Sequence, residues 1–356
     1  MVGTKMIVVN IKKMDMKNII KIAGLGLLIV GCTEIEPLPV VVNSADRNLT
    51  EIKNYKSTEH YISAVWFSNW KADGNMNSYL STLPDSLDMI ILKGEYDTLS
   101  DAQKADLRCV RGEKGTKVLM TADFDKIYEQ YVVALDEAER KGESMAEAKA
   151  ASEGREVSMG DIEAAIKTER QKVMDHYSTI GNTLLDRSEK IISEIGLDGL
   201  SISMSSTGDV FFREVVKRFI DTAGAKFHTA KRILVFDGYI GYVSNSCQWL
   251  DYVISTTHGN DRLSEVQDLF NSFMSMENAR AEQFLSYLSL ENDSWKVPYK
   301  DILSSVAVMD AKYKSLSLWK PLTGERTGGM ALRGVENDYE NKYSVLRQTI
   351  QYLNLK

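Results

Sequence analysis

Residues 196–205 read GLDGLSISMS, and apolar and hydroxyl side chains alternate along the second half of this segment. Leu200, Ile202 and Met204 fall on one side of the alternation, whereas the serines fall on the other. Such alternation is typical of a β-strand, in which successive side chains point to opposite faces. The segment therefore predicts a strand over 199–204 that presents a row of hydroxyls on one face.

Apolar runs of similar length recur on both sides of this segment. Strands are predicted at 61–67, 87–92, 116–122, 199–204, 232–236, 250–255, 283–288 and 329–333. Helical patterns lie between them at 101–109, 125–152, 159–195, 208–223, 262–276 and 299–307, and the last follows at 340–352. Because strands that alternate with helices form parallel sheets, and eight such units can close on themselves, we expect an α/β fold, a (β/α)8 TIM barrel.

The connection between the third and fourth predicted strands is unusually long. Residues 125–195 exceed one crossover helix, and Ser158 and Asp161 resemble an N-terminal cap before a second helical run. The connection is therefore expected to contain an insertion or a helix pair. Since no internal repeat and no Gly/Pro-rich linker divides residues 59–356, we expect one barrel domain.

The composition of the chain limits its class. Its 356 residues are 44% hydrophobic and 26% charged, as in ordinary globular proteins. The formal net charge of -7 argues against a nucleic-acid partner, because phosphate binding needs a concentrated basic surface. Of the three cysteines, Cys109 and Cys247 lie beside apolar runs and are expected to be buried free thiols rather than a disulfide.

The remaining cysteine ends a targeting segment. Residues 16–31 read MKNIIKIAGLGLLIVG, with Lys17 and Lys21 near the start and an apolar run too short to span a membrane. Residues 29–32 resemble a bacterial lipobox, whose cysteine thiol takes a diacylglycerol. We therefore expect residues 1–32 to be an N-terminal extension and lipoprotein signal peptide, with Cys32 as the lipidation site and its acyl chains as the lipid anchor.

Polar residues follow this cysteine. Glu34 and Glu36 resemble the acidic surface-export signal of glycan-scavenging Gram-negative bacteria. This resemblance implies a location at the outer membrane, lipid-anchored and facing the extracellular side. Residues 33–58 are predicted to be a tether between the anchor and the barrel domain, which we place at 59–356.

The strand segment also resembles the fourth strand of glycoside hydrolase family 18, whose pattern is D-G-x-D-x-D-x-E. Asp198 and Gly199 match the first two positions. In that family the glutamate is the general acid, and the nearest aspartate orients the substrate N-acetyl group, whose oxygen acts as the nucleophile. Here Ser201 and Ser203 stand where the other two aspartates would be, and Ser205 stands where the glutamate would be.

Other segments extend this resemblance to about residues 60–355. Residues 65–70 resemble the aromatic end of the family's first strand, 250–254 its sixth strand, and 328–338 the Gly-Gly opening and acidic end of its eighth. The resemblance is closest to the endo-β-N-acetylglucosaminidase-like branch that occurs as lipoproteins in glycan-uptake systems. Arg333 stands where many members place an aromatic platform under the cleaved sugar, so the floor of the site is expected to be remodelled.

The serine substitutions change the chemistry that the resemblance implies. A serine hydroxyl cannot protonate a glycosidic oxygen at neutral pH, because the pKa of an alcohol is far too high. Ser203 also lacks the negative charge that would stabilise an oxazolinium-like intermediate. Hydroxyls still donate and accept hydrogen bonds. The resemblance therefore implies a protein with no catalytic residue, which captures an oligosaccharide or a glycoprotein glycan, such as an N-glycan, for outer-membrane glycan transporter components.

Ligand contacts in such a barrel come from the carboxyl-terminal ends of the strands. Aromatic rings stack on the C–H faces of sugars, and polar side chains pair with sugar hydroxyls. The predicted ligand-binding residues are Trp66, Trp70, Asp123, Asp237, Tyr239, His258, Asn292, Trp295, Arg333 and Glu336, with Tyr242, Asn260 and Glu291 as further candidates. Trp66 fits a core position equally well, and Trp319 fits loop packing as well as binding.

Two other functions stay open at this level. An active endo-β-N-acetylglucosaminidase would need a relocated acid such as Asp237 or Glu336, although each fits a structural salt bridge better. A scaffold protein would contact a partner lipoprotein or transporter without touching glycan. We predict no metal and no cofactor, because the four histidines lack metal-ligand spacing and the sequence has no P-loop or dinucleotide-binding motif.

Overall fold

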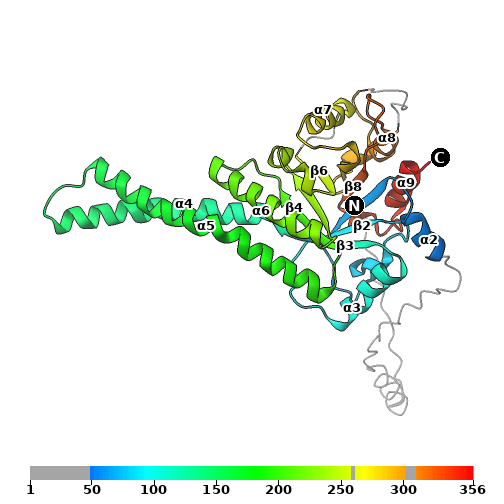
Figure 1. Cartoon of the computed structure of the whole chain (residues 1–356), viewed down its shortest axis with the longest axis horizontal. Helices are drawn as coiled ribbons and strands as arrows, with labels where there is room; N and C mark the ends of the chain where they lie inside the picture. The colour runs from blue at the N-terminus through cyan, green and yellow to red at the C-terminus, as the bar shows by residue number, and fades with distance from the viewer. Residues whose placement is uncertain (1–48, 258–260, 302–309, 356) are drawn as a thin grey trace, which may run out of the picture. The chain divides into compact units, whose positions relative to one another are not determined.

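The computed structural model describes residues 49–257, 261–301 and 310–355. Their strands form a closed barrel in the order β1-β2-β3-β4-β5-β6-β7-β8 (Figure 1). The strands are β1 (Ile62–Phe67), β2 (Met89–Leu92), β3 (Lys117–Asp123), β4 (Gly199–Met204), β5 (Ile233–Gly238), β6 (Tyr252–Ser255), β7 (Phe284–Ser289) and β8 (Gly329–Arg333). Every neighbouring pair is parallel, including β8 with β1. The structure confirms the predicted (β/α)8 TIM barrel.

The helices surround this barrel. They are α2 (Leu49–Lys56), α3 (Asp101–Arg108), α4 (Phe124–Ser152), α5 (Met159–Ile195), α6 (Val210–Thr229), α7 (Leu263–Met274), α8 (Lys312–Leu318) and α9 (Ser344–Leu353). After β1 and β5 the chain forms short 3-10 turns instead of an α-helix. The sequence predicted neither α2 nor α8. The helix predicted at 299–307 lies for the most part outside the described residues.

Strand alternation divides the core into two layers. The barrel interior is filled by a cluster of side chains from seven strands: Ala64, Trp66, Met89, Ile91, Leu119, Val235, Ile254, Leu285 and Ala331. The opposite faces of the strands pack against the helices in a larger core, to which β4 contributes Leu200, Ile202 and Met204. The serines of β4 therefore point inward, as the alternation predicted.

Two glycines permit close approach of neighbouring strands. A Cβ added to Gly199 would lie 2.0 Å from the carbonyl oxygen of Ile233 on β5. A Cβ added to Gly329 would lie 2.0 Å from the carbonyl oxygen of Ile62 on β1, and the φ of Gly329 is +141°. Because glycine has no side chain, β4 and β8 can pair closely with their neighbours at these two positions.

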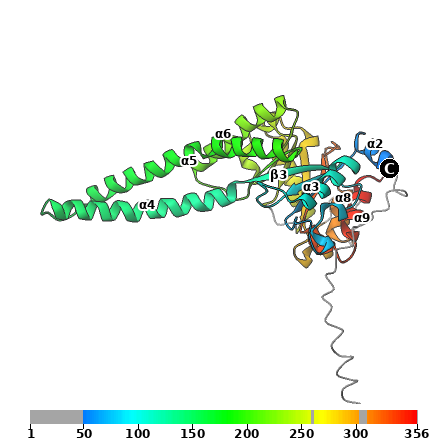
Figure 2. The same cartoon turned by 90° about the horizontal axis from the view of Figure 1, so that it is seen from below.

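The long connection after β3 is a helical hairpin. In Figures 1 and 2, α4 and α5 lie side by side and extend away from the barrel. Aromatic rings fill the base of the hairpin. The ring centre of Phe124 lies 4.8 Å from that of Phe219 of α6, and the ring centre of Tyr131 lies 5.1 Å from that of Tyr177. Farther out, a Cβ on Gly142 would lie 2.6 Å from the Cα of Ile166, so small residues bring the two helices together. The predicted helix pair is confirmed.

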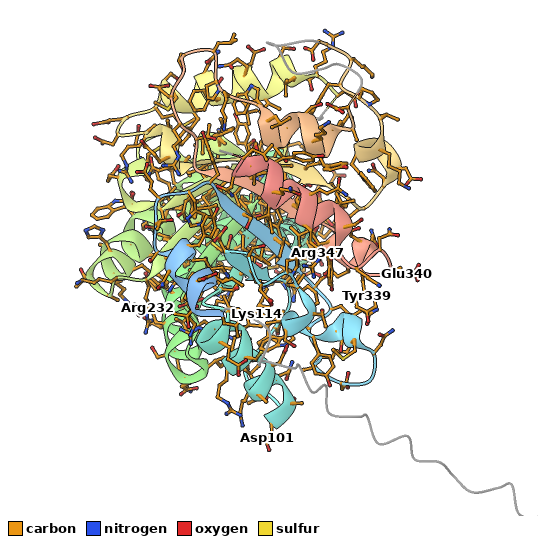
Figure 3. All side chains as sticks on the ribbon, turned by 90° about the vertical axis from the view of Figure 1, so that its right-hand side faces the viewer. Asp101, Lys114, Arg232, Tyr339, Glu340 and Arg347 are labelled. Atoms are coloured by element: carbon orange, nitrogen blue, oxygen red, sulfur yellow. The ribbon has the colours of Figure 1, made fainter. Side chains whose placement is uncertain are left out.

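The partly buried Lys56 connects α2 to the amino-terminal end of the barrel, the side on which Lys114 and Arg232 are labelled in Figure 3. Lys56 Nζ donates to the carbonyl oxygens of Leu87 and Lys114 and, at 2.8 Å, to Thr116. Burial lowers the pKa of Lys56 to about 8. These contacts correct the predicted tether of residues 33–58, because its last part, Leu49–Lys56, is a helix of the folded unit.

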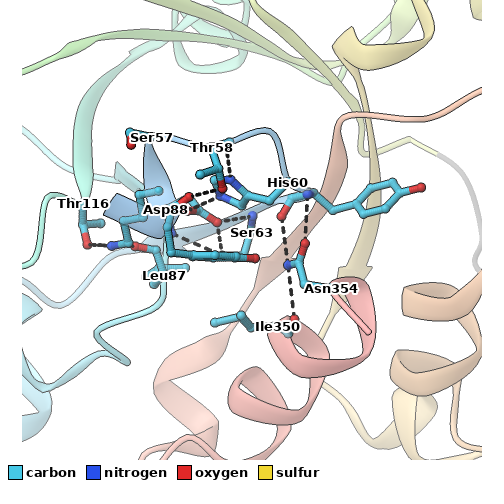
Figure 4. Close-up of polar contacts among 12 residues, drawn as sticks. Ser57, Thr58, His60, Ser63, Leu87, Asp88, Thr116, Ile350 and Asn354 are labelled. Carbon is cyan, nitrogen blue, oxygen red and sulfur yellow. Dashed lines mark hydrogen bonds and ion pairs between the residues drawn. The ribbon is translucent and has the colours of Figure 1, made fainter. Parts of the chain in front are cut away.

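A second polar cluster lies at the same end of the barrel (Figure 4). His60 Nε2 lies 2.8 Å from Asp88 Oδ1, and Asp88 Oδ2 accepts from both the backbone N–H and the hydroxyl of Ser63. The hydrogen bond to Asp88 raises the pKa of His60. Asn354, just after α9, accepts from the N–H of Tyr61 and so attaches the last helix to β1.

The predicted signal peptide, the lipidation site Cys32 and most of the tether lie outside the described residues. In the part of the chain that is described, no helix is both long enough and apolar enough to cross a membrane. Cys109 and Cys247 are both free thiols, as expected, but only Cys247 is fully buried.

Candidate functional site

The inward hydroxyls of β4 converge on a carboxylate of the next strand. In the strand register, Ser203 is paired with Asp237 of β5. Ser201 Oγ donates to Asp237 Oδ2 at 2.7 Å, and Ser203 Oγ donates to Asp237 Oδ1 at 2.9 Å. Asp237 is 0% exposed. A buried carboxylate needs such partners, and both of its oxygens have one here.

Arg333 at the end of β8 covers the middle of the barrel mouth. Its guanidinium lies 4.8 Å from the ring centre of Trp66 and 5.5 Å from that of Tyr287, and Nη2 is 3.8 Å from Asp237 Oδ1. The Trp66 and Tyr287 rings meet edge to face at 5.7 Å. The Arg333 side chain is 26% exposed. A cation stacked on two rings therefore forms the floor of the mouth.

A second cation reaches the serine row from β2. Lys93 directly follows the last residue of this strand, and its Nζ donates to Ser203 Oγ at 3.1 Å. Ser203 thus accepts from Lys93 while it donates to Asp237. Lys93 and Arg333 place two positive groups around one buried carboxylate.

The last serine of the row is held by the start of α4. Asp125 accepts from the backbone N–H groups of Ser205 and Ser206 at 2.8 and 2.9 Å. The hydroxyl of Ser205 lies 3.3 Å from that of Thr256, just after β6. Ser205 is partly exposed, so its hydroxyl lies at the rim of the mouth.

A side pocket opens beside the mouth, with a volume of about 390 Å³. Its walls come from the loop after β2, the end of β3, and the parts of α4 and α5 nearest the barrel. Lys93 and Asp123 belong both to this pocket and to the mouth. Lys93 donates to Ser203, and Asp123 is paired with Ser203 in the strand register.

Several predicted aromatic contacts are core residues. Trp70 is 2% exposed, and its indole N–H donates to Asp106 at 2.9 Å, so it cannot stack on a sugar. Its ring instead lies 5.1 Å from that of Tyr96, which lines the side pocket. Trp319 is also buried and packs against Phe270. Trp66 is buried under Arg333, and its indole N–H has no hydrogen-bond partner among the described residues.

The predicted acids take different positions. Asp123 is exposed and caps α4 by accepting from the N–H of Lys126. Glu336 accepts from the backbone N–H and the hydroxyl of Ser68 at 2.6 and 2.9 Å. Glu336 therefore positions the chain after β1, whereas Asp237 lies below the surface of the mouth.

The remaining candidates lie in loops after other strands. After β5, Tyr239 is partly exposed, and Tyr242 is buried and donates to the carbonyl oxygen of Ser206. Asn292 caps a short 3-10 turn after β7, in which Trp295 packs 5.9 Å from Tyr313. Glu291 is exposed next to this turn. His258 and Asn260 lie outside the described residues.

Sequence reasoning missed three groups of the mouth and the side pocket. Lys93 and Tyr287 continue the inward alternation of β2 and β7, so the period of two could have identified both. Tyr96 lies in a loop and carries no such signal. Its phenol, whose pKa burial raises to about 12, donates to the carbonyl oxygen of Lys93.

This arrangement limits what the mouth can do chemically. Hydroxyls, an ammonium and a guanidinium are hydrogen-bond donors that suit sugar hydroxyls and carbonyl groups. None of them is a proton donor of the strength that glycosidic cleavage needs. The carboxylate that they surround, Asp237, is fully buried and has both oxygens occupied.

Comparisons with known proteins point to one family. A family model described as glycoside hydrolase family 18, BT1044-like, matches residues 34–278. The endo-beta-N-acetylglucosaminidase F2 of Elizabethkingia meningoseptica is 24% identical over 309 residues, which cover 82% of this chain and 78% of that protein.

Solved structures have the same fold. A BT1044 structure, in a selenomethionine form with a glutamate-to-glutamine substitution, superposes with a TM-score of 0.61 and 23% identity over 86% of this chain and 91% of that one. The apo structure of an endo-beta-N-acetylglucosaminidase from Cordyceps militaris gives a TM-score of 0.58 and 18% identity over 86% of this chain and 95% of that one.

Proposed function

The chain belongs to glycoside hydrolase family 18, in its BT1044-like group, and on this premise we propose that it is a non-catalytic glycan-binding member of the family. The observation that carries the proposal is the serine row of β4. Ser201 and Ser203 point inward below the mouth and Ser205 lies at its rim, and none of the three carries the carboxyl group that would be needed to protonate a glycosidic oxygen.

A relocated acid is the competing explanation, and the geometry argues against it. A general acid must come within hydrogen-bond distance of the glycosidic oxygen. Asp237 is fully buried and engaged by two hydroxyls, so it does not reach a bound sugar without rearrangement of β4 and β5. Glu336 is engaged by Ser68 and supports the chain after β1.

The mouth retains the groups that binding requires. Lys93 and Arg333 offer charged donors, Ser205 offers a hydroxyl at the rim, and Tyr287 offers a partly exposed ring. Sugars are commonly held by a few such polar groups beside aromatic surface. The named relatives are endo-beta-N-acetylglucosaminidases, so the class of ligand that we propose is an N-acetylglucosamine-containing oligosaccharide such as an N-glycan.

The cellular setting is part of the proposal. The lipobox-like segment that ends at Cys32 and the acids that follow it support a lipid-anchored protein on the outer surface, where it would deliver glycan to outer-membrane transporter components. Metabolic labelling with an alkyne fatty acid tests the anchor: we expect label on the wild type and none on Cys32→Ala. Label on the variant, or none on the wild type, would contradict it.

The binding function is tested by titration calorimetry and mass spectrometry on the same sample. We expect N-glycans to bind while N-glycoproteins remain intact. The matched variant is Ser205→Glu, which places one carboxyl group at the rim. Ser203 is left unchanged, so the aspartate that the family has at this position is still missing. The variant should also leave glycoproteins intact, because the N-acetyl group would still lack its orienting carboxylate. Failure of the wild type to bind any N-glycan, mucin or chitin-type oligosaccharide would refute the proposal.

A further inference from the structure

The side pocket beside the barrel mouth has the features of a binding site and no assigned function. Its volume of about 390 Å³ falls within the range of small-molecule sites. Its inner wall is apolar, with Met120, Ile127, Leu184 and Ile191 among the side chains that form it. Such a surface suits the C–H face of a sugar ring or the methyl group of an acetamido substituent.

The polar groups around this wall are balanced in charge. Three cations line the pocket, Lys93, Lys126 and Arg187, together with three acids, Glu95, Asp97 and Asp123. Several of these are already paired: Lys126 contacts Glu95 at 2.8 Å, and Arg187 contacts Asp97 at 2.8 Å. With no net charge, the pocket has no electrostatic preference for an ionised ligand.

One buried polar group in the pocket wall lacks a partner. Ser188 of α5 lines the side pocket and is 0% exposed, and its hydroxyl makes no hydrogen bond to any described residue. An unpaired buried hydroxyl is costly and uncommon in folded proteins. A rotation of this side chain toward the pocket would let a ligand hydroxyl or carbonyl provide the missing partner.

The pocket adjoins the mouth and shares two residues with it. Lys93 lines it and donates to Ser203, and Asp123 lines it and lies opposite Ser203 in the strand register. We propose that the side pocket binds a neutral sugar residue of the same oligosaccharide whose N-acetylglucosamine core lies in the mouth. This inference rests on the proposed glycan-binding function and adds a second point of contact to it.

Bulky substitutions at the exposed rim test this inference without disturbing the core. Gln130 of α4 and Thr183 of α5 both line the pocket and are exposed. Gln130→Trp and Thr183→Trp should each fill the pocket from its outer side. Glu129→Trp is the matched control, because Glu129 is the exposed neighbour of Gln130 and does not line the pocket.

Calorimetry of the full chain in detergent gives the readout. The long probes are N-glycans released from ribonuclease B and from desialylated fetuin, and the short probe is chitobiose, which is long enough only for the mouth. Each pocket variant should lower affinity for a long probe by about tenfold or more, while affinity for chitobiose and the behaviour of Glu129→Trp stay as in the wild type. Equal affinity of all variants for the long probes would overturn the inference and leave the proposed function intact.

Two other outcomes are informative. A wild type that binds neither probe would overturn both the proposed function and this inference. If sialylated fetuin glycans bind more tightly than desialylated ones, and only when the pocket is open, then the pocket takes an acidic sugar and the assignment to a neutral one is wrong.

Ser188→Ala separates a ligand contact from a structural role. Because the hydroxyl has no partner in the described chain, its removal should leave the thermal midpoint unchanged or raise it. Affinity for the long probes should fall by about threefold to tenfold, the loss of one hydrogen bond. A lower thermal midpoint with unchanged affinity would show that Ser188 serves the fold, and the hydroxyl would be removed from the site.

Discussion

At the amino-terminal end of β4, Asp198 keeps its carboxylate, whereas at the carboxyl-terminal end the inward positions carry serines. Asp198 accepts from Arg111 through Nε at 2.7 Å and Nη2 at 2.9 Å, and from the backbone N–H of Val118 at 2.9 Å. The serine end is more open: Lys93 and Arg333 are partly exposed, and a cavity adjoins it.

This difference separates the needs of the fold from those of the chemistry. The carboxylate of Asp198 holds β3, β4 and the chain after α3 together, so the barrel needs it whether or not any sugar is cut. Inward acids at the other end would serve chemistry, and their absence leaves the barrel closed. The two ends of one strand can therefore change independently, as fold-supporting and ligand-facing ends of TIM barrels generally do.

The largest effect is expected from the close strand contact at the amino-terminal end. Gly199→Ala places a methyl group 2.0 Å from the carbonyl oxygen of Ile233, where the backbone of β5 cannot move aside. We expect a loss of more than about 3 kcal/mol in the free energy of unfolding, measured by urea denaturation. Gly160→Ala is the control, because the atom nearest to its new methyl group, Ser158 Oγ, is 3.9 Å away. Equal denaturation midpoints for the two variants would contradict this account.

The next effect concerns Asp198 itself. Asp198→Ala leaves Arg111 without its bidentate partner and the N–H of Val118 without an acceptor. We expect a loss of about 2–3 kcal/mol, with glycan affinity of the folded fraction unchanged. Lys117→Ala should cost less than about 0.5 kcal/mol, since that exposed lysine lies 3.7 Å from Asp198. A comparable loss of stability in both variants would mean that Asp198 contributes no more to the fold than the exposed lysine beside it.

The opposite pattern is expected at the carboxyl-terminal end. Arg333→Met keeps much of the contact with Trp66 and Tyr287 but removes the charged donors. Affinity for an N-glycan should fall about tenfold, because a hydrogen bond from a charged group contributes about 1.5 kcal/mol. The urea midpoint should fall less than in Asp198→Ala, because Asp237 loses a cation at 3.8 Å but keeps both serine hydroxyls. A variant that loses stability and keeps its affinity would show that Arg333 belongs to the fold.

The smallest effect is a pH dependence at the amino-terminal end. His60 contacts two acceptors, Asp88 and the carbonyl oxygen of Thr58, which favour its charged form, and its pKa is raised. The resulting stabilisation is fully present below about pH 6.5, the ordinary value for histidine, and is lost as pH rises through the raised pKa.

The wild type should therefore exceed His60→Gln in unfolding free energy by at most about 1 kcal/mol at pH 6, and by less at pH 8. Urea denaturation at both pH values measures this difference. Lys56, whose pKa is about 8, also titrates over this range, but it does so in both proteins, so its effect cancels in the difference. A difference that grows with pH would contradict the assignment to His60.

Much of the fold was predictable because strand alternation and helical periodicity are local properties. The eight strands and the helix pair at 124–195 agree with the sequence patterns to within a few residues. Leu49–Lys56 was missed because its reason to fold is tertiary: Lys56 finds acceptors on the loops before β2 and β3. Its sequence alone is as polar as a tether.

The site was predictable where it follows the strand period or the family resemblance. The inward direction of Ser201 and Ser203 follows from alternation, and the floor position of Arg333 follows from the resemblance to family 18. The burial of Trp70 beneath Tyr96 does not, because both residues lie after the strands, where side-chain direction has no period. The side pocket depends on how α4 and α5 meet the loop after β2, which no single segment encodes.

We expect this family 18 barrel to hold a glycan without cutting it. The most direct measurement incubates the purified full chain with ribonuclease B at the concentration at which calorimetry shows saturation by its released glycans, and follows the intact mass of the glycoprotein. Bound glycan and an unchanged glycoprotein mass after prolonged incubation are the expected results. Loss of the glycan mass, leaving one N-acetylglucosamine on the protein, would contradict this expectation.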